Sequence, residues 1–216
     1  MKDIYSILFD KIITGEYPAG TKLKQEDLAR EFSISRTPVR IVLQQLDQDG
    51  LVKLTLNKGA IVLPFTADEI EEIYEIRKPL ELLCLDITSP FLSVHKLMEI
   101  KKDIQDNYQS EDVELLTNLD ARLHSYIINS SKKKRLINLL NQLSRLLQNF
   151  RSLGFLEKDT KEQALDEHIG LIDALCKRDT ANAKLLMKQH IENSKNIALS
   201  QLFKVKKLRN NTQDSF

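Results

Sequence analysis

Four side chains in the second half of the chain are of the types that bind divalent metal ions. They are Asp120, His124, His168 and His190. Asp120 and His124 are four residues apart in a helical pattern of apolar residues, which places both on or beside its buried face. The other two histidines lie in two further patterns of this kind, and polar groups that face a bundle core need partners. One carboxylate and three imidazoles from three helices suit Zn²⁺, Ni²⁺, Mn²⁺ or Fe²⁺, so these four side chains could satisfy one another around a divalent metal ion.

A second set of chemically suited residues opens a helix predicted from about Arg36 to Gln48. The side chains at its start are Ser35, Arg36, Thr37 and Arg40. Arg36 and Arg40 are four residues apart and share a helix face, and a planar guanidinium fork suits either guanine or a phosphate. The two hydroxyl groups are suited to capping the helix and to donating to phosphate. We therefore predict that this helix contacts DNA.

The elements that position these arginines are predicted to be short and separated by tight turns. Residues 1–65 hold seven of the eleven glycines and prolines of the chain, and these residue types interrupt regular structure. The predicted elements are helices at about 3–14, 26–32 and 36–48 and strands at 51–56 and 60–63. Lys58 and Gly59 lie in the hairpin turn, from which Lys58 could reach a backbone phosphate or the minor groove. This order predicts a winged helix-turn-helix with a small β-hairpin wing, whose second helix enters the major groove.

The elements that position the Asp/His set are predicted to be long helices. Beyond residue 65, apolar residues recur at helical spacing, which indicates about six helices and no convincing strand. Thr66 as N-cap and Glu69 three residues later form a predicted capping box at the junction. The chain is therefore predicted to be mainly α. Its predicted domains are a winged helix-turn-helix at 1–65, an all-α helical-bundle ligand-binding domain at 66–203, and a basic, polar tail at 204–216.

Composition indicates a soluble globular protein and excludes a disordered tail protein, with 42% hydrophobic and 29% charged residues in a chain of 216. No apolar run is long enough to cross a bilayer, and the two cysteines are expected to be free thiols in a reducing cytoplasm. The net charge of +1 argues neither for nor against nucleic acid. Residues 1–65 carry nine Lys or Arg against eight acidic residues, so DNA recognition must come from where the charges are placed.

Two alternatives to a regulator stay open at this level. One is a helical dimerisation domain in which the Asp/His set is purely structural and only hydrogen-bonds internally. The other is a metal-dependent enzyme with a DNA-docking module, because the same ligands could hold an ion that activates water or oxygen. We expect no enzyme, because the sequence shows no evident general base beside these residues and no recognisable catalytic motif.

The N-terminal motifs carry a family resemblance. They are Gly15, Gly20, Leu23, Leu28-Ala29, Ser35-Arg36-Thr37-Pro38-Val39-Arg40, Leu43, Leu46 and Gly50-Leu51-Val52. This pattern resembles the DNA-binding domain of GntR-type transcription regulators. The resemblance implies a winged helix that binds palindromic double-stranded operators as a homodimer. Ile41 and Val42 replace the usual Glu-Ala pair, which we interpret as a change in packing.

The C-terminal motifs carry a second resemblance. They are Arg77-x-x-x-Glu81, Asp120-x-x-x-His124, Glu167-His168-x-x-Leu171-Ile172-x-Ala174-Leu175, Asp179, Ala183, Met187 and His190. They resemble the effector domain of the FadR-like (FCD) branch of the same family. The resemblance implies that Asp120 and the three histidines are metal ligands, that a small carboxylate effector fills open metal positions, and that Arg77 pairs with it. The alternative for Arg77 is a structural ion pair with Glu81. The expected function is that of a cytoplasmic, ligand-responsive transcription regulator, and of a repressor in particular.

Overall fold

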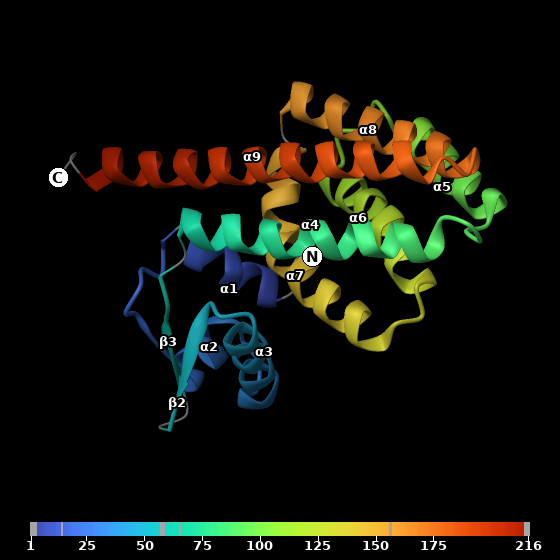
Figure 1. The fold of residues 1–216 in the computed structure, drawn as a ribbon. Helices are drawn as coiled ribbons and strands as arrows, with labels where there is room; N and C mark the ends of the chain where they lie inside the picture. Colours follow the sequence, from blue (N-terminus) through green and yellow to red (C-terminus); the bar gives the residue numbers. More distant parts are fainter. Residues whose placement is uncertain (1–3, 14, 57–58, 65, 156, 214–216) are drawn as a thin grey trace. The chain divides into compact units, whose positions relative to one another are not determined.

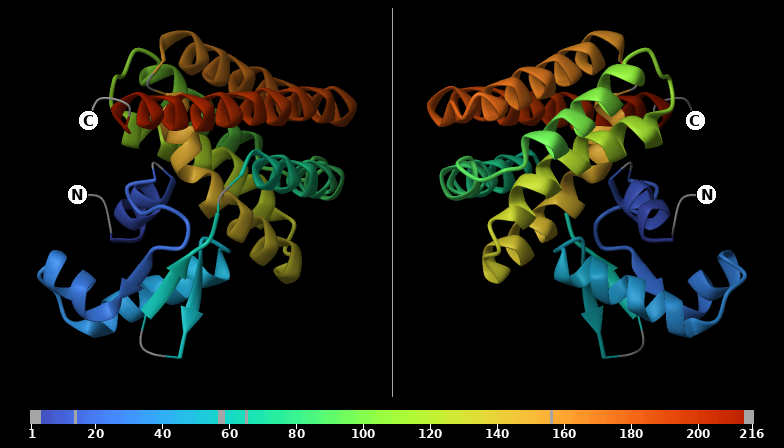
Figure 2. Two further views of the ribbon diagram at one scale, coloured as in Figure 1. Left: turned by 90° about the vertical axis from the view of Figure 1, so that its left-hand side faces the viewer. Right: turned by 90° about the vertical axis from the view of Figure 1, so that its right-hand side faces the viewer.

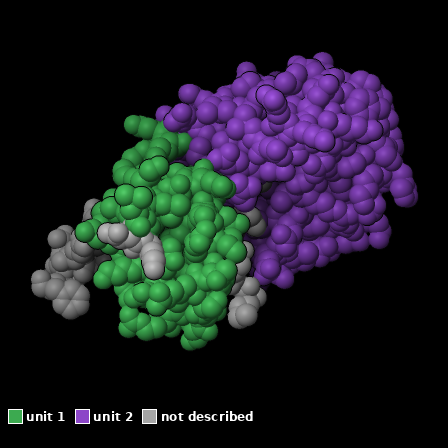
Figure 3. All heavy atoms as spheres, turned by 90° about the horizontal axis from the view of Figure 1, so that it is seen from below, with its two compact units in different colours: residues 1–69, 202–216 green, residues 70–201 purple. Residues whose placement is uncertain are grey.

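The computed structural model describes residues 4–13, 15–56, 59–64, 66–155 and 157–213. They divide between two compact units, one within residues 1–69 and 202–216 and the other at residues 70–201 (Figures 1 and 3). Among these residues, no helix combines the length and the apolar composition that a membrane crossing requires.

The N-terminal unit is a helix-turn-helix packed on a small sheet. Its helices are α1 (Ile4–Ile13), α2 (Gln25–Glu31) and α3 (Arg36–Gln48), and its strands are β1 (Lys22–Lys24), β2 (Val52–Thr55) and β3 (Gly59–Val62). The sheet is antiparallel in the order β1-β3-β2, so Ala60 pairs with both Leu23 and Leu54. Buried apolar side chains of all three helices and the sheet form its core, among them Leu8, Leu28, Leu43 and Val62.

The sheet differs from the predicted two-stranded wing by one strand. The residues of β1 were not predicted to be extended, because a strand of three residues with one buried side chain, Leu23, shows no usable alternation. Gly59 is needed where β1 meets β3, since a Cβ atom there would lie 2.5 Å from the carbonyl oxygen of Leu23. Lys58, the predicted wing contact, lies outside the described residues.

The second part of the chain is built from long helices. They are α4 (Ala67–Thr88), α5 (Val94–Asp106), α6 (Val113–Ser130), α7 (Lys134–Gly154), α8 (Lys158–Cys176) and α9 (Thr180–Gln213). Both views of Figure 2 show α8 and α9 side by side. The described residues of this part contain no strand, and the predicted fold class, mainly α with a winged helix-turn-helix, is confirmed.

The predicted start of this helical part is present in the structure, and its predicted end is not. The predicted capping box is present before α4: the backbone N–H of Thr66 donates to Glu69 Oε2 at 2.7 Å, and the N–H of Glu69 donates to Thr66 Oγ1 at 3.3 Å. At the other end, α9 continues through residues 204–213, where a separate tail was predicted.

Candidate metal centre and nucleic-acid interface

Three helices bring the four predicted metal-binding side chains together. Asp120 and His124 lie on α6, His168 on α8 and His190 on α9, and all four are buried. Each offers one ligand atom, and these atoms all lie within 4.8 Å of one another. We call these four residues the Asp/His cluster.

The spacing within the Asp/His cluster matches what a metal ion requires. The Nε2 atom of His190 lies 3.2 Å from His124 Nε2 and 3.3 Å from His168 Nε2. Asp120 Oδ1 lies 3.3 Å from His168 Nε2. Metal–nitrogen bonds of about 2.0–2.1 Å place neighbouring nitrogen ligands about 2.9 Å apart in octahedral coordination and about 3.3 Å apart in tetrahedral coordination. The donor set and its spacing therefore fit a divalent ion.

Two carboxylates behind the cluster determine which ring nitrogens face inward. Glu81 Oε2 lies 2.6 Å from His124 Nδ1, and Glu167 Oε2 lies 2.8 Å from His190 Nδ1. A carboxylate accepts hydrogen bonds, so Nδ1 of each neutral ring is the donor and Nε2 carries a lone pair. With both rings in this neutral form, their Nε2 lone pairs face each other across 3.2 Å, an arrangement that a cation between them stabilises.

The sequence motifs include Glu81 and Glu167 but did not predict this role. Glu81 entered only as a partner of Arg77, and Glu167 only as the neighbour of His168 in the chain, whereas its carboxylate contacts His190. The available signal was their position: each acid lies close in sequence to a buried charged or metal-binding side chain on an amphipathic helix.

The pKa shifts favour the protonation states that metal binding requires. Burial lowers the pKa of His124 below its usual value, and it outweighs the opposing effect of Glu81, so the ring is neutral. Burial alone would raise the pKa of Glu167, but the hydrogen bond from His190, the charge of a protonated His190, and hydrogen bonds from Asn193 and Gln163 outweigh it and lower that pKa. A neutral imidazole and a charged carboxylate behind it are the forms that a metal site uses.

Arg77 on α4 is fully buried beside the cluster. Its Nε donates to Glu81 Oε1, so the structural ion pair considered for it is present. Its Nη1 has no hydrogen-bond partner among the described residues. A buried guanidinium with an unused donor is costly unless another acceptor meets it.

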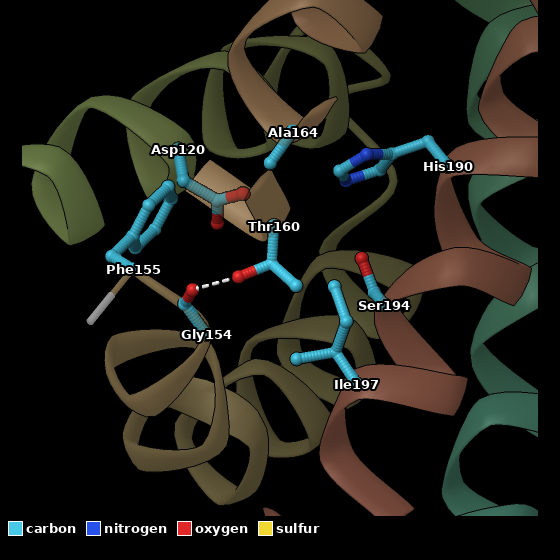
Figure 4. A pocket seen from close by; sticks show the side chains of 8 residues that line it. All are labelled: Asp120, Gly154, Phe155, Thr160, Ala164, His190, Ser194 and Ile197. Atoms are coloured by element: carbon cyan, nitrogen blue, oxygen red, sulfur yellow. Dashed lines mark hydrogen bonds between the residues drawn. The ribbon is translucent and has the colours of Figure 1, made fainter. Parts of the chain in front are cut away.

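A small cavity adjoins the cluster (Figure 4). Its volume is about 30 Å³, which is room for about two water molecules. Its lining residues are Asp120, Gly154, Phe155, Thr160, Ala164, His190, Ser194 and Ile197. Asp120 and His190 therefore belong to both the cluster and the cavity wall.

The predicted DNA-contacting side chains lie exposed at the start of α3 in the N-terminal unit. They are Ser35, Arg36, Thr37 and Arg40. Ser35 occupies the N-cap position, although its side chain makes no capping hydrogen bond. Arg36 Nη1 lies 2.9 Å from Glu26 Oε1 of α2, a contact that was not predicted. Ile41 is 52% exposed and Val42 is partly buried, so the interpretation of this pair as a packing change stays a prediction.

Comparison with known proteins decides the family. The model of the FCD domain matches residues 72–193, and that of the gntR family of bacterial regulatory proteins matches residues 1–62. The chain belongs to the GntR family and carries an FCD domain. Members of this family are transcriptional regulators, which removes the enzyme alternative.

Relatives of this GntR regulator match over most of its length. The HTH-type transcriptional regulator YdhC of Bacillus subtilis is 28% identical over 192 residues, which cover 87% of this chain and 84% of YdhC. The gluconate operon transcriptional repressor of Bacillus subtilis is 29% identical over 182 residues, which cover 79% of this chain and 73% of the repressor.

Solved structures share the fold of this GntR regulator. McbR/YncC of E. coli superposes with a TM-score of 0.71 at 19% identity, covering 93% of this chain and 99% of that chain. The Zn²⁺-bound FCD domain of TM0439 superposes with a TM-score of 0.54 at 23% identity, covering 65% of this chain and 99% of that domain.

Proposed function

We propose that this GntR regulator is a cytoplasmic repressor that binds its operator as a homodimer and responds to a small carboxylate held at a divalent metal. The observation that carries the proposal is the convergence of three buried Nε2 atoms and one carboxylate oxygen at metal-ligand spacing. The repressor assignment is supported by the gluconate operon repressor among its relatives.

In this proposal Asp120, His124, His168 and His190 hold the ion. The zinc-bound FCD domain of TM0439 supports zinc as the first ion to test, and the donor set also suits Ni²⁺, Mn²⁺ or Fe²⁺. Bound there, the metal would supply a Lewis-acidic centre with positions open to a carboxylate. Glu81 and Glu167 hold the rings of His124 and His190 with Nε2 inward.

Besides the metal, the effector would meet Arg77 of this chain. Arg77 has a buried guanidinium nitrogen without a partner among the described residues, and a carboxylate is its natural acceptor. The cavity of about 30 Å³ is too small for a molecule of several carbon atoms. Binding would therefore require its walls on α7, α8 and α9 to separate, which gives the effector two arrangements to discriminate.

DNA reading is assigned to the exposed start of α3. Arg36 and Arg40 are proposed to contact guanine or phosphate, Ser35 and Thr37 phosphate, and Lys58 with Gly59 the backbone at the wing. In a homodimer, two such helices would enter successive major grooves about 34 Å apart on a palindromic site. The effector would release DNA by favouring the arrangement that binds the operator less tightly.

Metal analysis of protein purified without a histidine tag tests the metal site. We expect one divalent ion per chain in the wild type and in His95→Ala, because His95 is exposed and lies outside the cluster. His168→Ala should lose the ion. A wild type without stoichiometric metal, together with a His168→Ala variant that folds and regulates normally, would establish the purely structural cluster instead.

A thermal-shift screen of small carboxylates tests the effector. We expect at least one of them to raise the melting temperature of the metal-loaded protein and to have no effect after chelation. An equal shift with and without chelator would show that the carboxylate binds elsewhere.

Substitution of the two arginines tests DNA reading. Arg36→Ala and Arg40→Ala should each weaken binding to a duplex enriched from a random library by roughly 1–3 kcal/mol if they contact bases. Unchanged affinity and unchanged salt dependence in both variants would refute the assignment.

A further inference from the structure

The two arginines at the start of α3 differ in their electrostatic surroundings. Arg36 Nη1 is paired with Glu26 Oε1 at 2.9 Å, and the two side chains are 59% and 60% exposed. Arg40 makes no ion pair with any residue that the structure describes and is exposed. An acid therefore neutralises one of the two cations on the proposed DNA-reading face.

We propose that Glu26 is a specificity-determining residue that withholds Arg36 from DNA phosphates in non-specific complexes. The proposal rests on the DNA-reading role proposed above for α3. Glu26 lies in the first turn of α2, and in helix-turn-helix complexes that helix crosses the phosphate backbone. Its carboxylate thus competes with phosphates for Arg36 and is itself repelled by them.

The strength of the pair is suited to this task. An ion pair as exposed as this one changes an equilibrium constant about five-fold at most. A contact between Arg36 and a single phosphate changes an equilibrium constant by a similar factor. On DNA of arbitrary sequence, such a contact is therefore too weak to displace the ion pair with Glu26. A guanine offers two hydrogen bonds in fixed geometry, and this contact discriminates between bases by about 5- to 150-fold. Only the contact with the correct base is therefore strong enough to displace Glu26 from Arg36.

Because the N-terminal part carries almost no net charge, the loss of one phosphate-binding cation changes the salt dependence of its DNA binding measurably. Residues 1–65 carry nine basic and eight acidic residues, so few phosphates can be neutralised. Each neutralised phosphate contributes about −0.9 to the slope of log K against log salt concentration on duplex DNA. Withholding one arginine is thus measurable on DNA of any sequence.

The experiment compares Glu26→Gln with Asp27→Asn in the full-length chain on a mixed-sequence duplex. Asp27→Asn is the matched control, because it removes the same charge from the next residue in the chain. Asp27 pairs with Arg30 of α2 and not with a residue of α3. Between about 50 and 200 mM salt, we expect Glu26→Gln to steepen the slope by about 0.9. At about 50 mM salt Glu26→Gln should bind several-fold more tightly than the wild type. Asp27→Asn should do neither, because its partner Arg30 lies in the last turn of α2 and not at the proposed DNA-reading start of α3.

Double variants show whether Glu26 acts through Arg36. In an Arg36→Ala background, Glu26→Gln should no longer steepen the slope. On the same duplex, Arg36→Ala alone should leave the slope of the wild type unchanged, whereas Arg40→Ala should reduce it by about 0.9. Equal slopes for Glu26→Gln and Asp27→Asn, or a change in slope that persists in the Arg36→Ala background, would overturn the proposal, whereas a gain in affinity from the lost repulsion alone leaves the slope unchanged.

A duplex enriched from a random library by the wild type separates this inference from the proposed function. If Arg36→Ala and Arg40→Ala bind that duplex as the wild type does, the assignment of α3 to DNA reading fails, and this inference fails with it. If both weaken that binding while Glu26→Gln behaves like Asp27→Asn on the mixed-sequence duplex, only the role of Glu26 fails.

Discussion

Glu167 shows how much of the candidate metal centre depends on a residue that is not itself a proposed ligand. Its carboxylate accepts hydrogen bonds from His190 Nδ1 at 2.8 Å, Asn193 Nδ2 at 2.5 Å and Gln163 Nε2 at 3.0 Å. These contacts hold the His190 ring on α9 in one orientation and in one tautomer. The position of a proposed metal ligand is thus set by a residue on another helix.

Replacing Glu167 should therefore weaken metal binding without removing a ligand. We expect Glu167→Gln to lower the affinity for zinc by about 10- to 100-fold, because the amide holds the His190 tautomer less firmly. Competition with a chromophoric chelator measures this affinity. Glu162→Gln is the control, since it removes the same charge from α8 at a residue that pairs with Lys158 and lies outside the Asp/His cluster. Equal affinities for the two variants would contradict the role of Glu167.

The two cysteines should differ sharply in reactivity. Cys84 is fully buried, and burial raises the pKa of its thiol to about 12. At pH 8 only about one Cys84 side chain in 10,000 is then a thiolate, the form that reacts. Cys176 is only partly buried. We expect a disulfide reagent at pH 8 to modify Cys176 in the folded protein and Cys84 only after unfolding. Equal rates in the folded state would contradict the burial of Cys84.

The histidines of the cluster could be predicted from the sequence, and the carboxylates behind them could not. His124, His168 and His190 lie in apolar helical patterns, and a histidine in such a place is conspicuous. Glu81 and Glu167 are ordinary helix residues by type. Their roles depend on contacts with histidines of other helices: Glu81 and His124 are 43 positions apart in the chain, and Glu167 and His190 are 23 positions apart. A local sequence pattern does not predict such contacts.

At the scale of elements, two glycines differ in the space that a Cβ atom would have. A Cβ atom on Gly59 would lie 2.5 Å from the Leu23 carbonyl oxygen of the neighbouring strand, whereas one on Gly170 in α8 would meet Leu186 Cδ1 at 3.9 Å. The first distance requires the backbone to shift, and the second is an ordinary van der Waals contact.

We therefore expect opposite signs from the same substitution. Gly59→Ala should destabilise the N-terminal unit by about 1–3 kcal/mol through overpacking. Gly170→Ala should stabilise the helical unit by about 0.5–1 kcal/mol, because alanine is the better helix former. Urea unfolding followed by circular dichroism measures both. A Gly59→Ala variant as stable as the wild type would contradict the close packing at Gly59, and a destabilised Gly170→Ala variant would contradict the room around Gly170.

The success of element prediction followed the length of each element. The amphipathic pattern of α3 predicted both of its ends, and Thr66 with Glu69 marked the start of α4. β1 was missed because its three residues are extended through pairing with β3, and the paired residues Leu23 and Ala60 are 37 positions apart in the chain. Strand pairing over such a distance is a tertiary effect that overrides weak local preference.

At the scale of the whole molecule, metal binding should stabilise one unit and leave the other unchanged. All four residues of the Asp/His cluster lie within the unit at 70–201. Metal at about 100 times its dissociation constant adds about 2.7 kcal/mol to the stability of the state that binds it. In calorimetry, chelation should lower the transition of the helical unit alone. A His168→Ala variant should show no response to chelator, and a wild type whose two transitions move together would contradict this assignment.

Asp120 and His190 belong both to the Asp/His cluster and to the wall of the cavity. A molecule that enters the cavity must touch or displace groups that a cation in the cluster needs, so the two binding events share a coupling free energy. Reciprocity then requires each to change the affinity of the other by the same factor. In the proposed function, in which the effector binds at the metal, this GntR regulator would respond to its effector only while the metal is bound, and metal depletion would abolish the response.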